Sequence, residues 1–162
     1  MPDLDLIARG IAIGVAGSAA MDLWSAVLRR RFGVSGLDYR LLDRWIGHVQ
    51  RGRFVHKHIA LAESFSGELA LGWVAHYAIG VAFALLLVAM WGRAWADAPT
   101  IGPALVVGLG TVVAPWFVMQ PAMGAGFAGS STPNPAATRL RNVASHAVYG
   151  LALYGSAIVL AA

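Results

Sequence analysis

Four apolar stretches, each long enough for a membrane-spanning helix, set the strongest limit on how this chain can fold. They cover approximately residues 6–28, 69–91, 101–120 and 142–161. A helix needs about 20 apolar residues to cross the ~30 Å hydrocarbon core of a bilayer. Because backbone groups inside that core cannot bond to water, we expect such a chain to be helical. The sequence therefore predicts an all-α integral membrane protein, a four-helix bundle in which residues 1–162 form a single membrane domain.

The composition supports a membrane protein and excludes several other classes. Of the 162 residues, 58% are hydrophobic and 12% are charged, whereas soluble domains usually contain roughly 25% charged residues. The basic residues cluster beside the apolar stretches and no nucleic-acid motif accompanies them. We therefore expect no nucleic acid partner, but a lipid bilayer that includes anionic lipids. The absence of cysteine excludes disulfides, thiolate metal ligands and thiol catalysis.

The segment between the first two apolar stretches predicts the orientation in the membrane. From residue 29 to residue 57 it holds eight basic residues against two acidic ones. By the positive-inside rule this segment lies in the cytoplasm, so both termini lie outside, an N-out, C-out arrangement. At the N-terminus, Asp3 and Asp5 occupy positions where a cleaved signal peptide would be basic, which favours a retained first helix.

The same basic segment contains an amphipathic pattern. Its apolar residues recur at helical spacing: Leu37, Leu41, Leu42, Trp45, Ile46 and Val49. We expect an amphipathic helix lying on the inner leaflet, and the alternative is a docking helix for a partner. Four further residues there are candidate metal ligands: His48, His56, His58 and Glu63. His56 and His58 are two positions apart, so on a helix they would point in different directions. The alternative to a metal site is an ordinary solvated loop.

The third stretch and the segment that follows it are rich in helix-breaking residues. Pro115 should kink the third span and free one backbone carbonyl. Residues 121–138 contain glycine, serine and proline but too few apolar residues to span a membrane. We expect a Gly/Pro-rich loop between spans 3 and 4, either re-entrant and covering a pocket or a flexible turn.

Three motifs carry a resemblance to a known family. They are PWFVMQPAMGAGFA at 115–128, STPNP at 131–135 and SHAVYG at 145–150. Together they resemble a bacterial family of small inner-membrane proteins known only as a domain of unknown function. The resemblance covers nearly the whole chain and implies a multi-pass protein of the bacterial inner membrane. It implies no activity, cofactor or catalytic residue.

Polar residues on separate spans lie at a similar depth. Asp22, His76 and His146 each lie seven or eight positions from the charged residue that borders their span, which at ~1.5 Å per residue is on the order of 10 Å. Burying such groups is costly unless they face one another. We therefore predict a shared pocket in the cytoplasmic half of the bilayer. Its candidate ligand-binding residues are Asp22, Glu68, His76, Gln120, Asn142 and His146.

The main functional hypothesis is that this pocket binds or transports a small ligand, a metal ion or a proton-coupled solute. Asp22, His76 and His146 would be proton carriers or ligands of a divalent metal, because carboxylate and neutral imidazole suit both roles. Since four spans are few for a transporter, we expect a homo-oligomer. An enzyme is the least supported class, because no set of nucleophile, base and orienting residue is recognisable.

Two alternatives remain open. In the first, His76 and His146 ligate one haem b, and the glycines at 72, 80 and 150 make room for the macrocycle. In the second, the protein is an accessory or structural subunit without chemistry, and the polar groups only hold helices together.

Overall fold

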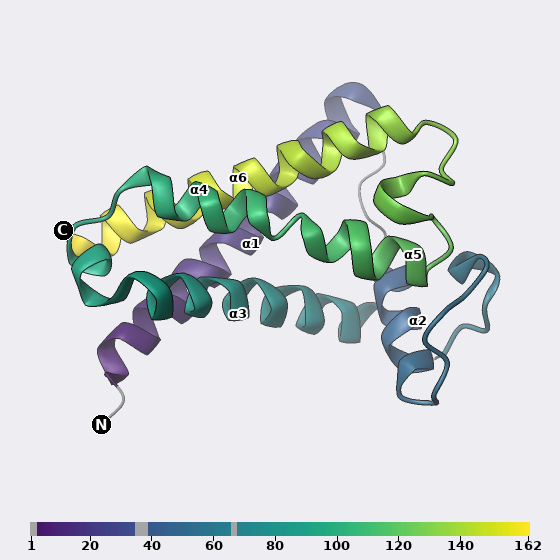
Figure 1. Cartoon of the computed structure of the whole chain (residues 1–162), viewed down its shortest axis with the longest axis horizontal. Coiled ribbons are helices and arrows are strands. Elements are labelled where there is room, and N and C mark those ends of the chain that lie inside the picture. Colours follow the sequence, from purple (N-terminus) through teal and green to yellow (C-terminus); the bar gives the residue numbers. More distant parts are fainter. Residues whose placement is uncertain (1–2, 35–38, 66–67) are drawn as a thin grey trace. The chain divides into compact units, whose positions relative to one another are not determined.

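The computed structural model describes residues 3–34, 39–65 and 68–162, and in these residues all regular structure is helical (Figure 1). Four helices are long and apolar enough to cross a membrane: Leu4–Phe32, Ala70–Asp97, Ile101–Ala122 and Pro135–Ala161. The prediction of an all-α protein with four spans is confirmed. The sidedness of these spans stays a prediction.

The helices follow the apolar pattern of the sequence. They are α1 (Leu4–Phe32), α2 (Tyr39–Val49), α3 (Glu68–Asp97), α4 (Ile101–Gly110), α5 (Gln120–Ala122) and α6 (Pro135–Ala161). Three short turns lie between them: η1 (Ile59–Leu61), the π-helical η2 (Pro115–Met119) and η3 (Phe127–Gly129). Within α3, Gly92 has a φ of 68° and interrupts the helix, where the second apolar stretch was expected to end.

Two helix boundaries have a clear local cause. α4 ends at Gly110 and the chain resumes as a π-helical turn at Pro115, because proline has no N–H to bond to the carbonyl four residues before it. α6 begins at Pro135, seven residues earlier than the expected start of the fourth span. The Asn134 side chain accepts a hydrogen bond of 3.0 Å from the Ala137 N–H, and proline is favoured in the first turn of a helix.

The chain packs as two compact units, which are described separately. Unit 1 comprises Met1–Gly36, Tyr77–Thr111 and Ala144–Ala162, and unit 2 comprises Leu37–His76 and Val112–Val143. Both α3 and α6 therefore contribute to both units. The prediction of a single domain stays a prediction.

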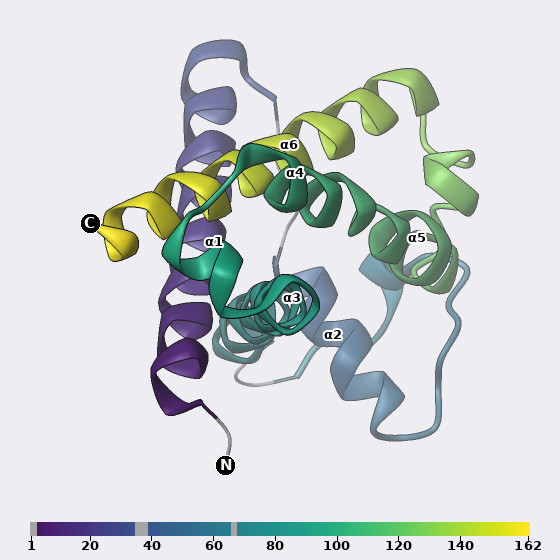
Figure 2. The same cartoon turned by 60° about the vertical axis from the view of Figure 1, so that its left-hand side comes forward.

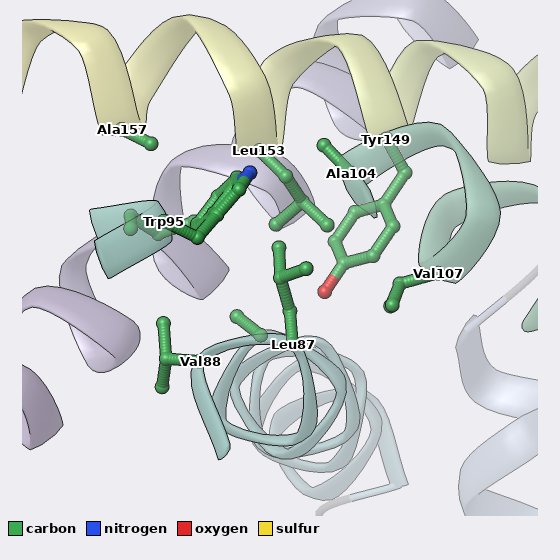
Figure 3. Packing of buried hydrophobic residues seen from close by; sticks show 10 residues of the cluster. Leu87, Val88, Trp95, Ala104, Val107, Tyr149, Leu153 and Ala157 are labelled. Carbon is green, nitrogen blue, oxygen red and sulfur yellow. The ribbon is translucent and has the colours of Figure 1, made fainter. Parts of the chain in front are cut away.

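Unit 1 holds the main apolar core. Buried residues from α1, α3, α4 and α6 meet there (Figure 3). The helices approach closely because small residues lie at their contacts: a Cβ on Gly14 would lie 2.6 Å from the Cα of Val81, and one on Gly108 would lie 2.5 Å from the Cα of Gly150. Small residues allow membrane helices to pack backbone to backbone. The core members are Ile13, Ala84, Leu87, Val88, Trp95, Ala104, Val107, Tyr149, Leu153 and Ala157.

Ion pairs join α1 to the end of α3 within unit 1. The Arg93 guanidinium lies 2.7 Å from an Asp3 oxygen and 3.0 Å from Asp5, and Arg9 lies 3.1 Å from Asp97. The Arg93 guanidinium holds the pKa of the Asp3 carboxyl below its usual value. Arg9 is half-buried and the other side chains are exposed, so the pairs contribute little to stability.

Unit 2 is built around α2 and the start of α3 (Figure 2). Leu42 and Asp43 of α2 are fully or almost fully buried. The Asp43 carboxylate lies against Gly72 of α3, where a Cβ would overlap it. The amphipathic helix is present, and part of its surface is covered by this chain. Leu37, expected at its start, lies outside the described residues, and its placement on a leaflet stays a prediction.

The Gly/Pro-rich segment folds as a compact turn in unit 2. The His56 N–H donates to the Ala122 carbonyl at 2.8 Å, and the Ile59 N–H donates to the Met123 carbonyl at 3.1 Å. Gly124, at a φ of 89°, lies so close to the Lys57 carbonyl that a Cβ would overlap it. These contacts attach the segment to residues 56–59.

Candidate functional site

His146 on α6 is held in one orientation by α4. Its Nδ1 lies 3.0 Å from the Thr111 hydroxyl and 3.2 Å from the Gly108 carbonyl. The Thr111 hydroxyl itself donates to that carbonyl at 2.7 Å. A carbonyl can only accept hydrogen bonds, so the hydrogen between the ring and Gly108 must belong to Nδ1. The neutral His146 ring therefore carries its hydrogen on Nδ1.

This tautomer leaves the other ring nitrogen available. Within the described residues the Nε2 of His146 has no hydrogen-bond partner. When one imidazole nitrogen donates to a carbonyl, the lone pair of the other is fixed in direction, an arrangement typical of metal-binding and proton-accepting histidines. His146 thus has the geometry of a metal ligand or proton acceptor, and its place in a shared pocket stays a prediction.

Asp22 on α1 accepts a hydrogen bond of 2.9 Å from the Tyr77 hydroxyl. From the sequence we expected Asp22 to face His76 and His146, and Tyr77, which directly follows His76, was not singled out. A carboxylate inside a span needs a hydrogen-bond donor. This requirement was the sequence signal that Asp22 has a partner. His146 bonds to α4 rather than to Asp22.

Gln120 and Asn142 are brought together in unit 2. The Gln120 Nε2 donates to the Asn142 Oδ1 at 2.8 Å, and the Trp116 indole donates to the same oxygen at 3.1 Å. The π-helical turn at Pro115–Met119 carries Trp116 and leads directly into Gln120. Trp116 is a member of this cluster that the site prediction missed.

His76 and Glu68 complete the predicted set. The His76 ring is half-buried in unit 2 and stacks edge to face on Trp73, with 6.4 Å between the ring centroids. The Glu68 side chain lies outside the described residues. Asp22 and His146 belong to unit 1, while His76, Gln120 and Asn142 belong to unit 2, so a pocket shared by all of them stays a prediction.

A family model matches residues 11–160, and its description is "Protein of unknown function (DUF2938)". The chain belongs to this family. The resemblance drawn from the three motifs is thereby confirmed over nearly the full length. No curated protein and no solved structure matches the chain.

The DUF2938 fold uses the candidate haem glycines for helix contacts. Gly72 packs against Asp43 and Gly80 packs against Ser18. A Cβ on Gly150 would lie 2.9 Å from the Ala104 carbonyl oxygen. The space that these glycines were expected to leave for a macrocycle is thus filled by neighbouring helices. The two histidines remain candidate haem ligands, but these glycines no longer support space for the macrocycle.

The metal hypothesis also lacks a preformed cluster. Among the residues that the structure describes, no three histidine, aspartate or glutamate side chains are grouped closely enough to hold a metal ion. The proposed ligand set of Asp22, His76 and His146 therefore stays a prediction. Of the three, His146 has the clearest ligand geometry.

Proposed function

We propose that this DUF2938 member is a multi-pass protein of the bacterial inner membrane that binds or transports a small ligand through polar groups on its spans. The observation that carries the proposal is the fixed His146 ring, whose Nδ1 donates to Gly108 and whose Nε2 has no partner in the described chain. A neutral imidazole in this state can accept a proton or coordinate a divalent metal ion. Function as a homo-oligomer is part of the proposal.

The anchor of His146 supports this role. A histidine that served only to join two helices would gain most by using both nitrogens, whereas His146 makes both of its contacts through Nδ1. Groups that orient a ligating imidazole typically change ligand affinity by ~10- to 100-fold when they are removed. Thr111 is the positioning residue in this arrangement.

Zinc titration of the detergent-purified protein tests the proposal. We expect Zn²⁺ to bind to the wild type, to bind about tenfold more weakly to Thr111→Val, and to lose this site in His146→Gln. Tyr154→Phe on the same helix is the control for altered packing. Zinc binding by His146→Gln that equals the wild type, in protein that still inserts into membranes, would contradict the proposal.

A second candidate function, an accessory subunit without chemistry, rests on a different observation. The Tyr149 hydroxyl donates to the Gly80 carbonyl at 2.5 Å and Tyr77 donates to Asp22, so several polar groups of unit 1 are already used between helices. Contacts of this kind stabilise membrane bundles by ~0.6 to 2 kcal/mol each. Wild-type behaviour of the His146→Gln variant would favour this function.

A further inference from the structure

A cavity of about 520 Å³ lies in unit 2, at the turn that follows α2, and is open to the outside. None of its residues belongs to the site proposed above. Its polar lining consists of His48, Arg53, His56, Lys57, His58 and Glu63.

Backbone hydrogen bonds hold this lining in place. The His48 carbonyl accepts from the Arg51 N–H at 3.0 Å and from the Arg53 N–H at 2.9 Å, which folds the chain back after α2. On the other side, the His56 N–H donates to the Ala122 carbonyl. Arg53 and His56 are thus presented beside His48 by a fixed backbone.

Two imidazole rings in the lining have unused nitrogens. His48 is 3% exposed and its Nε2 lies 3.0 Å from the Glu63 carbonyl, so Nε2 carries the hydrogen and the Nδ1 lone pair is left. The Nδ1 of His48 and both ring nitrogens of His56 are buried, without a hydrogen-bond partner in the described residues. The ring centroids are 4.9 Å apart. Buried polar atoms without partners are rare, and a bound ligand is one way in which they are satisfied.

The charges around these nitrogens favour an anion. Arg53 and Lys57 line the cavity, are exposed, and form no ion pair within the described part of the chain. Glu63 is the single acidic residue of the lining. Burial of the His56 ring, with His48 and Arg53 nearby, holds the pKa of this imidazole below its usual value, as expected where the local potential is positive. A metal cation is disfavoured there, and an anion is favoured.

We infer that this cavity binds a phosphoryl anion, as inorganic phosphate or as the phosphate group of a lipid. Arg53 and Lys57 supply the charge. The unpartnered ring nitrogens of His48 and His56 are buried, so these rings must turn toward the anion to supply hydrogen bonds. An unprotonated phosphate oxygen can only accept hydrogen bonds, so the Nδ1 of His48, like the second ring nitrogen of His56, must take up a proton before it can donate to one. Binding through such oxygens is therefore coupled to proton uptake by the protein and strengthens as the pH falls, whereas a P–OH group of the ligand donates to these nitrogens without proton uptake.

Several titratable and charged groups lie around His56. His48, Arg53, Lys57, His58 and Glu63 line the cavity together with it. The segment 120–129, which packs against residues 56–59, contains no ionisable residue. Asp43, on α2 with His48, lies against Gly72 of α3. The set therefore contains three imidazoles, those of His48, His56 and His58.

Calorimetry on the full chain in an uncharged detergent tests the inference. The probes are inorganic phosphate, a short-chain phosphatidic acid, and sulfate, which has no proton to lose near neutral pH. We expect Arg53→Gln to weaken phosphate binding about tenfold, while Arg51→Gln, an exposed arginine two positions away that does not line the cavity, changes it less than twofold. His56→Gln should reduce the number of protons taken up on binding, measured in buffers of different ionisation enthalpy.

The binding results distinguish inorganic phosphate from a lipid phosphate group as the ligand. Binding of inorganic phosphate supports a soluble ligand, and binding of phosphatidic acid without inorganic phosphate supports a lipid headgroup. Sulfate should bind more tightly at about pH 6 than at about pH 7.5.

The inference is wrong if neither phosphate probe binds, if Arg51→Gln and Arg53→Gln weaken binding equally, or if Zn²⁺ binds here and phosphate does not. If His56→Gln does not fold, the arginine pair still decides. His146→Gln should leave phosphate binding unchanged, so failure here and failure of the proposed function can be told apart.

Discussion

Units 1 and 2 differ in what their polar side chains bond to. In unit 1, Tyr77 donates to Asp22, Tyr149 donates to Gly80, and His146 is anchored to α4. In unit 2, three ring nitrogens of His48 and His56 have no hydrogen-bond partner within the described residues. Unpartnered buried atoms also occur in unit 1, in Ser18 and Trp24, so the contrast lies in the imidazole nitrogens that gather at one place in unit 2.

The difference has a structural origin. Helix contacts in unit 1 depend on glycines that bring backbones together, so side-chain hydroxyls can reach carbonyls on the next helix. The turns of unit 2 are held by backbone hydrogen bonds between residues 56–59 and 122–123. Side chains add to this attachment: the Trp45 indole donates to the Phe54 carbonyl and Arg44 donates to the Ala60 carbonyl. The Nδ1 of His48 and both ring nitrogens of His56 take no part in it within the described residues, so a ligand is expected at these nitrogens.

The largest effect should come from adding a methyl group at a helix contact of unit 1. In Gly108→Ala the new Cβ would lie 2.5 Å from the Gly150 Cα, so α6 must move away. We expect a loss of about 3 kcal/mol in the free energy of unfolding, measured in mixed detergent micelles. The matched control is Gly110→Ala, since a Cβ there meets nothing within 4 Å. Equal stability of the two variants would show that α4 and α6 are not packed through glycine.

A smaller effect is expected when one polar contact of unit 1 is removed. Figure 3 shows the Tyr149 side chain in the core of unit 1. Tyr149→Phe deletes its hydrogen bond to the Gly80 carbonyl and should lower the free energy of unfolding by about 1 kcal/mol. Tyr154→Phe is the comparison, because Tyr154 packs against the same core and has no hydrogen bond in the described residues. If both substitutions lower the free energy of unfolding equally, the Tyr149 hydrogen bond adds no stability beyond the packing of the ring.

The smallest effect is a loss of stability in acid that depends on unit 2. The pKa of His56 is below its usual value of 6.5 in the folded chain, so below about pH 6.5 the unfolded chain binds the proton more readily. Stability should be unaffected by this group above that pH and should fall as the pH drops toward the folded-state pKa. The measurement is the unfolding midpoint as a function of pH, without phosphate. In His56→Gln this midpoint should fall less as the pH is lowered. An unchanged titration would show that the ring is not buried as a neutral group.

Local patterns were sufficient for much of the fold and part of the site. The four spans follow from apolar length, and the break at Pro115 follows from its missing N–H. Gln120 and Asn142 were placed among the candidate residues of one pocket, and these two are hydrogen-bonded to each other. The start of α6 at Pro135 could have been found from the Asn134 cap, a signal contained in STPNP.

The sequence by itself determined that this DUF2938 chain is helical, that it has four spans, and which polar residues lie within them. These properties depend on residue type and on spacing along one helix. Only the tertiary structure decided that Tyr77 serves Asp22, that His146 carries its hydrogen on Nδ1, and that His48 is buried beside His56. Each of these depends on which faces meet between segments far apart in the chain, and helical periodicity contains no information about that.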